Sequence, residues 1–192
     1  MIDRALEVLT DSIHSYLEHL PDLGVTTEDV ISLTHIVKDN GSVAIDPDSL
    51  GMSLINIEEE RTLKSMKATV VSDEGIVSHV NPELKLNLFV LIAANFNDYK
   101  KGLKYLTGAI RFFQSKNVFT HQNTPDLDGQ IEKLIVELHS LGFEQQNHLW
   151  GALGAKYLPS VMYKVKLIAI QEGHKADEEP PVRIIESSGK GI

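Results

Sequence analysis

Three consecutive glutamates and an arginine, Glu58, Glu59, Glu60 and Arg61, are the residues of this sequence best suited to chemistry. Two carboxylates on one surface can act as a general acid and a general base. The four residues end a β-branched stretch that begins at Ser53, and the side chains of a strand alternate between its two faces. Glu58 and Glu60 therefore share a face, and only these two could cooperate. A charged strand end is more commonly a solvated rim or a contact surface, because buried charges need partners.

Other motifs that could carry chemistry fail on their spacing. His14 and His19 are five residues apart on a predicted helix, too far around its axis to hold one metal ion. Gly151 to Lys156 lacks the gap that a phosphate loop has before Gly-Lys, and it follows a helix rather than a strand. The chain has no cysteine, which excludes thiolate metal sites, disulfides and cysteine catalysis. The sequence thus predicts a protein that is not an enzyme, with no catalytic residue, no cofactor and no metal site.

The length and net charge of the chain argue against several classes of function. The chain has 192 residues, of which 42% are hydrophobic and 23% charged, as in one ordinary globular domain. Its net charge of −9 argues against nucleic acid as a partner, because phosphate contacts depend on clustered Lys and Arg. The longest apolar run, residues 88–94, is too short for a bilayer, which needs about 20 residues, and the first residues lack a signal-peptide pattern. We therefore expect a chain that folds in the cytosol without direct membrane insertion.

Hydrophobic periodicity predicts an α+β domain over residues 1–172, with a mostly antiparallel or mixed β-sheet flanked by helices. A first helix is expected from Ile2 to Leu20, a second begins after a cap at Asn97 or Asp98, and a third covers 143–153. The predicted strands are 30–37, 53–61, 66–71, 84–94, 118–120 (at a sheet edge), 131–140 and 157–170.

Alternation within two of these strands assigns side chains to faces. One face of the strand 53–61 is expected to carry Ile55, Ile57, Glu59 and Arg61. The opposite face is expected to carry Leu54, Asn56, Glu58 and Glu60. The buried side of the strand 131–140 is expected to consist of Leu134, Val136 and Leu138.

Residues 173–192 are predicted to be a linker followed by a C-terminal arm, because residues 173–181 are polar and contain proline. Within the arm, Val182, Arg183, Ile184 and Ile185 belong to a short segment that is competent to form a strand. In a monomer such a segment would be a frayed tail. In an oligomer it can add a strand to the sheet edge of an adjacent subunit.

Several blocks of the sequence, taken together in their order and spacing, carry a resemblance to a known family. These blocks are Ser53–Arg61, Asn81-Pro82, Leu86–Phe96, Tyr99, Ile110–Gln114, Phe143-Glu144, Asn147–Trp150, Gly154 and Tyr157–Ser160. They resemble the tail-terminator, or cap, protein of phage-tail-like extracellular contractile injection systems of the antifeeding-prophage type. The resemblance runs from the first helix to about Ile170. Longer members of that family carry additional C-terminal sequence.

The resemblance implies a phage tail-terminator-like fold and a structural function. Such proteins form a ring, typically hexameric, at the baseplate-distal end of the inner tube and sheath, where they stop polymerisation and join the sheath to the tube. The implied partners are further copies of the chain and the tube and sheath proteins, first in the cytoplasm and then in a released or membrane-anchored particle. Two alternatives stay open: a cytosolic assembly adaptor or chaperone of the particle, and a small hydrolase or ligand-binding domain that uses the acidic strand end.

A ring requires a heterologous interface, in which each subunit contributes two different patches. The charged end of the strand 53–61 is one candidate patch, and its charges could pair with those of the strand 157–170 across subunits. The arm is a candidate link to a neighbour or to the sheath. The candidate interface residues are Asn56, Glu58, Glu59, Glu60, Arg61, Lys164, Lys166, Val182, Arg183, Ile184 and Ile185.

Overall fold

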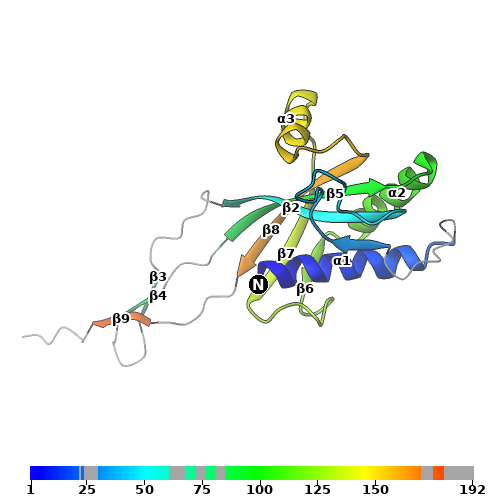
Figure 1. The fold of residues 1–192 in the computed structure, drawn as a ribbon. Helices are drawn as coiled ribbons and strands as arrows, with labels where there is room; N and C mark the ends of the chain where they lie inside the picture. The colour runs from blue at the N-terminus through cyan, green and yellow to red at the C-terminus, as the bar shows by residue number, and fades with distance from the viewer. Residues whose placement is uncertain are drawn as a thin grey trace, which may run out of the picture.

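A six-stranded mixed β-sheet is the centre of the fold, which Figure 1 shows as a computed structural model. The structure describes residues 1–21, 23, 30–60, 68–71, 77–80, 85–169 and 175–179. The strand order is β1-β2-β5-β8-β7-β6, in which β1 pairs with β2 in parallel and all other neighbours are antiparallel. The predicted α+β class and the edge position of β6 are confirmed. The strands of this sheet are β1 (Ile31–Leu33), β2 (Ser49–Glu59), β5 (Lys85–Asn95), β6 (Val118–Thr120), β7 (Ile131–His139) and β8 (Ser160–Ala169).

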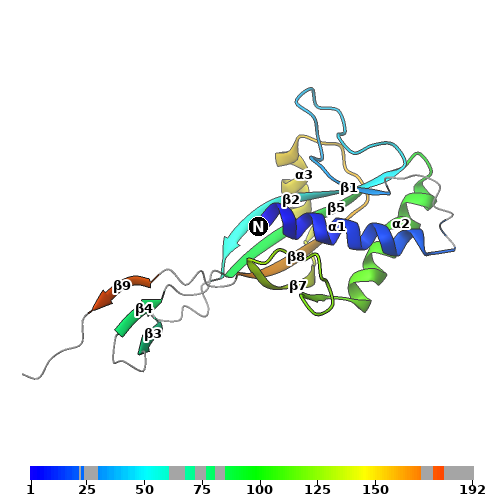
Figure 2. The ribbon, with the colours of Figure 1, turned by 90° about the horizontal axis from the view of Figure 1, so that it is seen from below.

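Helices lie on both faces of the sheet (Figures 1 and 2), with α1 and α2 on one side and α3 on the other. Local signals fix their ends. The Asp98 carboxylate accepts hydrogen bonds from the backbone N–H groups of Lys100 and Lys101, so Asp98, one of the two residues predicted as alternatives, caps α2. Gly154 closes α3 with φ of 65°, a conformation that suits glycine. The helices are α1 (Ile2–Glu18), α2 (Tyr99–Ser115) and α3 (Phe143–Leu153).

The larger hydrophobic core lies between the sheet and the pair α1 and α2. Every third or fourth residue of α1 is buried there, as its helical periodicity predicts. The two helices approach closely at Gly108, where an added Cβ would overlap Cδ2 of Leu17. This face of the sheet is therefore closed by tight packing.

A smaller core lies under α3 on the opposite face. Trp150, the only tryptophan of the sequence, is buried there. The other buried members are Ile36, Ile45, Leu91, Ala93 and Met162. Leu91, Ala93 and Met162 lie at one end of the sheet face, whereas Ile36 and Ile45 belong to the connection between β1 and β2. The helix α3 and this connection therefore cover only that end.

One β-bulge changes the predicted assignment of faces in β2. Leu54 pairs with Val90 and Asn56 pairs with Phe89, which leaves Ile55 as an extra residue. Leu54 packs against the larger core, whereas Ile55 packs against the smaller one. The predicted groupings of Leu54 with Asn56 and of Ile55 with Ile57 are therefore wrong, because simple alternation fails at a bulge.

Leu134 and Val136 of β7 are buried as predicted, but Leu138 is 59% exposed. The reason is the length of the neighbouring edge strand. β6 pairs only with residues 133–135, so β7 is itself the edge of the sheet at Leu138. The predicted strand 30–37 is likewise shorter than expected, since only Ile31–Leu33 pair within the sheet.

A second, antiparallel sheet of three strands lies apart from the larger one in both views (Figures 1 and 2). Its central strand β4 was not predicted, and β9 falls within residues 173–181, which were predicted to be a linker. Backbone pairing with β4 gives β9 its strand geometry without an alternating apolar pattern. Residues 182–185 of the predicted arm lie outside the described residues. The strands are β3 (Ala68–Val71), β4 (Val77–Val80) and β9 (Lys175–Glu179).

Candidate protein interface

The part of the sheet that α3 leaves uncovered carries polar side chains from four strands. Strand pairing places Asn56, Phe89, Lys164 and Glu137 in one row across β2, β5, β8 and β7. Residues that are directly opposite in antiparallel strands point to the same face, so this row shares the α3 side of the sheet. The next row contains Glu58, Asn87 and Lys166. We call this surface the polar sheet face, and its residues are Asn56, Glu58, Glu60, Asn87, Glu137, Lys164 and Lys166.

The charges of the polar sheet face are only partly paired within the chain. The Nζ of Lys166 donates a hydrogen bond of 2.8 Å to Oε1 of Glu137, and both side chains are well exposed to solvent. Exposed pairs of this kind contribute roughly 0.2–1 kcal/mol to stability. Lys164 lies directly opposite Glu137, yet it has no ion pair with any described residue. The face therefore presents charges of both signs that another protein can contact.

Amide side chains order the acidic side of this surface. The Nδ2 of Asn56 donates a hydrogen bond of 3.2 Å to Oε1 of Glu58. The Nδ2 of Asn87 donates one of 3.1 Å to Oε2 of Glu60. Glu58 and Glu60 thus lie on one face, as predicted.

Asn87 is only 4% exposed, and its Oδ1 has no hydrogen-bond partner among the described residues. An unpaired buried acceptor costs about 1–3 kcal/mol, so a donor from outside these residues would stabilise it. Asn87 was not predicted as a site residue. Its position between Leu86 and Leu88 was the available signal, since an amide in an apolar stretch of a strand needs a partner.

Five of the predicted interface residues come together on the polar sheet face. They are Asn56, Glu58, Glu60, Lys164 and Lys166. Glu59 does not join them, because it pairs with Leu86 on the opposite side of the sheet. Arg61, Val182, Arg183, Ile184 and Ile185 lie outside the described residues.

The described part of the chain contains no group of three or more His, Asp or Glu side chains placed to hold a metal ion. Within the same residues, no helix combines the length and apolarity that crossing a membrane requires.

Comparison with known protein families classifies the chain. The family model described as the Pvc16 N-terminal domain matches residues 5–184, nearly the whole sequence. The chain belongs to this family. No curated protein matches the chain significantly.

Two solved structures share the fold of the chain. One is the sheath/tube terminator, in the extended state, of the extracellular contractile injection system PVC. It matches with a TM-score of 0.62 and 13% identity, over 100% of this chain and 64% of that chain. The other is the tube terminating cap of the anti-feeding prophage, with a TM-score of 0.60 and 12% identity, over 98% of this chain and 61% of that chain. The chain thus spans less than two thirds of either structure, and the predicted family resemblance is confirmed together with the fold.

Proposed function

We propose that this chain is a structural terminator of a contractile injection system. In this role it caps the baseplate-distal end of the inner tube and sheath, stops their polymerisation and joins the sheath to the tube. The observation that carries the proposal is the family match over residues 5–184. The two similar structures support it, because one is a sheath/tube terminator and the other a tube terminating cap. The role is non-enzymatic, since it requires binding and no reaction.

The proposal includes a closed, hexameric ring that assembles in the cytoplasm and then becomes part of the particle. Its partners are the tube protein, the sheath protein and further copies of this chain. We assign the polar sheet face to contact with one of these partners. Its mixed charges support the assignment, because a contacting surface can pair with Lys164, which has no ion pair with any described residue.

The first experiment tests the terminator role itself. Particles are purified from cells that carry the gene and from cells that lack it, and tail lengths are measured by electron microscopy. We expect tails of uniform length with the gene and uncontrolled lengths without it. Immunogold labelling should mark one tip of each wild-type particle. A chain that is present in the lysate and absent from every particle would instead be an assembly adaptor or chaperone, and the proposal would be wrong.

A second experiment tests the polar sheet face. The double variant Glu58→Lys and Lys164→Glu reverses two of its charges, and Glu7→Lys on α1 is the matched control. We expect the double variant to fold but to lose tail capping, whereas the control keeps it. Native mass measurement then separates a lost contact between copies from a lost contact with tube or sheath. Normal capping by the double variant would contradict the assignment.

The C-terminal arm is tested by a chain that ends at residue 181, which retains β9. If the arm links the cap to a neighbour or to the sheath, this chain should fold and fail to cap tails. Unchanged capping would remove residues 182–192 from the proposed interface.

A further inference from the structure

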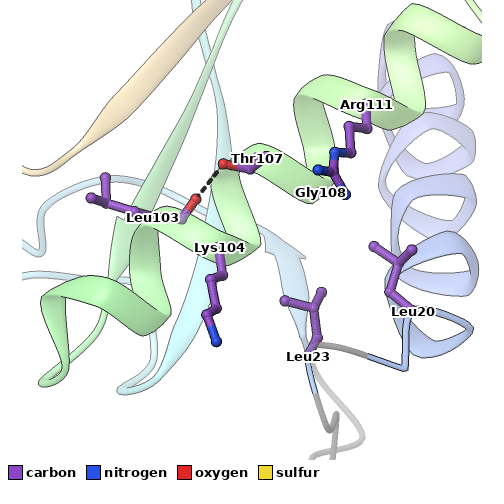
Figure 3. A pocket seen from close by; sticks show the side chains of 7 residues that line it. All are labelled: Leu20, Leu23, Leu103, Lys104, Thr107, Gly108 and Arg111. Atoms are coloured by element: carbon purple, nitrogen blue, oxygen red, sulfur yellow. Dashed lines mark hydrogen bonds between the residues drawn. The ribbon is translucent and has the colours of Figure 1, made fainter.

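A groove of about 440 Å³ lies between the C-terminal end of α1 and the outer side of α2. Figure 3 shows Leu20 and Leu23 pointing toward α2, which carries Lys104 and Arg111 at the border of the groove. Leu103, at 41% exposure, adds further apolar surface. The groove therefore combines an apolar lining with two cations, a composition that suits an apolar group next to an acid.

The charges of α2 contrast with those of the rest of the chain. From residue 99 to residue 125 the sequence contains no Asp or Glu, although the whole chain has a net charge of −9. Some cations of this stretch are held by rings, such as Lys101 over Phe96 and Tyr105. Lys104 and Arg111 have neither an ion pair nor a ring contact with any described residue. Two cations at the groove are thus available to an acidic partner.

The same chain presents an apolar group next to an acid at the start of α3. Phe143 is 93% exposed, more than any other large hydrophobic side chain among the described residues. Glu144 follows it and is also exposed. An acid in the first turn of a helix is favourable by itself, but an almost fully exposed phenylalanine has no such benefit. Aromatic side chains that enter a pocket are the usual anchors of protein interfaces.

The groove and the start of α3 lie on opposite sides of the sheet, as Figures 1 and 2 show, so they cannot meet within one chain. We infer that Phe143 and Glu144 of one copy enter the α1–α2 groove of the next copy. The Phe143 ring packs on the leucines of the groove, and the Glu144 carboxylate pairs with Lys104 and Arg111. This contact joins two different patches, so it repeats from copy to copy and closes into a ring if the rotation permits. The inference rests on the ring of the proposed function and assigns its subunit contact.

Complementary variants test this contact by native mass measurement. The α3 variant carries Phe143→Ser and Glu144→Lys, and the groove variant carries Lys104→Glu and Arg111→Glu. Each should be a folded monomer where the wild type is a ring, because loss of an anchor weakens such a contact by a factor of about 30 or more. An equimolar mixture should give a heterodimer, since only one intact contact can form. Lys100→Glu, on α2 but not in the groove lining, should keep the ring.

Restoration of the ring distinguishes a direct contact from an indirect effect. A single chain with Glu144→Arg, Lys104→Glu and Arg111→Glu should form the ring again, because its charges are exchanged.

Cross-linking tests the same contact. The chain contains no cysteine, so only the introduced thiols can react. Arg111→Cys with Glu144→Cys should give covalent multimers with a short bismaleimide. Glu7→Cys with Glu144→Cys should not.

The outcomes separate this inference from the proposed function. If wild-type chains form a ring and cap tails while the α3 and groove variants also form rings, the inference is wrong and the terminator role stands. If the wild type forms no ring, either alone or with tube and sheath proteins, the ring and this contact are both wrong.

Discussion

The two faces of the six-stranded sheet differ in how much of them is covered. On the face under α1 and α2, side chains such as Leu88, Leu134 and Val165 form a continuous buried layer. On the other face, α3 covers one end and leaves the polar sheet face open. Because adjacent residues of one strand point to opposite faces, the same strands supply both surfaces. The comparison indicates that one face mainly stabilises the fold and that the other is free to make contacts.

Adjacent substitutions in β7 give the largest expected difference between the faces. Leu134→Ala should lower the free energy of unfolding by about 2–5 kcal/mol, because it leaves a cavity in the larger core. Ile135→Ala, one residue further on the half-buried face, should cost less than about 2 kcal/mol. Urea unfolding of both variants measures the two costs. Equal costs would show that the faces do not differ in this way.

Ionisation of a buried tyrosine provides a second comparison. Tyr163 packs against Phe113 in the larger core, and burial raises its pKa to about 12. The unfolded chain loses this proton at a lower pH, so stability is retained below about pH 10 and falls as the pH rises toward 12. A shift of this size corresponds to roughly 2–3 kcal/mol. Tyr163→Phe should reduce the alkaline loss measured by urea unfolding, with pH 8 as the reference. An unchanged alkaline slope would contradict this.

The end of the sheet that α3 covers should be sensitive to added volume. A Cβ at Gly51 would lie 2.5 Å from Cγ1 of Ile45, in the smaller core. Gly51→Ala should therefore lower the free energy of unfolding by about 1–3 kcal/mol, because the added methyl group overpacks this core. Gly129→Ala is the matched control, because nothing lies within 4 Å of its added Cβ. Thermal unfolding compares them, and a neutral Gly51→Ala would mean that this end is loosely packed.

The smallest effect on stability is expected on the polar sheet face. Removal of the exposed pair of Lys166 with Glu137 should change the free energy of unfolding by roughly 0.2–1 kcal/mol. A double-mutant cycle with Lys166→Ala and Glu137→Ala isolates the pair. Tail capping by Lys166→Glu then sharpens the comparison, because we expect a large loss of capping at nearly constant stability. A coupling of several kcal/mol would instead make this pair a structural element.

The elements of the fold that depend on local signals were predictable from the sequence. The cap at Asp98 and the terminating Gly154 fix helix ends through their immediate neighbours. The bulge at Ile55 and the exposure of Leu138 depend on the pairing and length of partner strands, which local patterns do not contain. The strand β9 depends on distant backbone pairing for the same reason.

The candidate interface was predictable only in part. Alternation placed Glu58 and Glu60 on one face, and it separated them from Glu59. That Lys164 and Lys166 join them follows from the position of β8 beside β5, which is a property of the sheet order. The groove beside α2 depends on how α1 and α2 pack together, and β1, β2, β3, β4 and β5 separate these two helices in the sequence. Local sequence patterns therefore do not predict it.

The extra residue in β2 bears on how homologous genes can diverge. Since Ile55 has no counterpart of its own on β5, its deletion would leave Asn56 opposite Phe89 and every later pair intact. Deletion of another residue of β2 would turn the residues between the deletion and the bulge to the opposite face of the sheet. In homologous genes, insertions and deletions within β2 should therefore accumulate at the codon for residue 55.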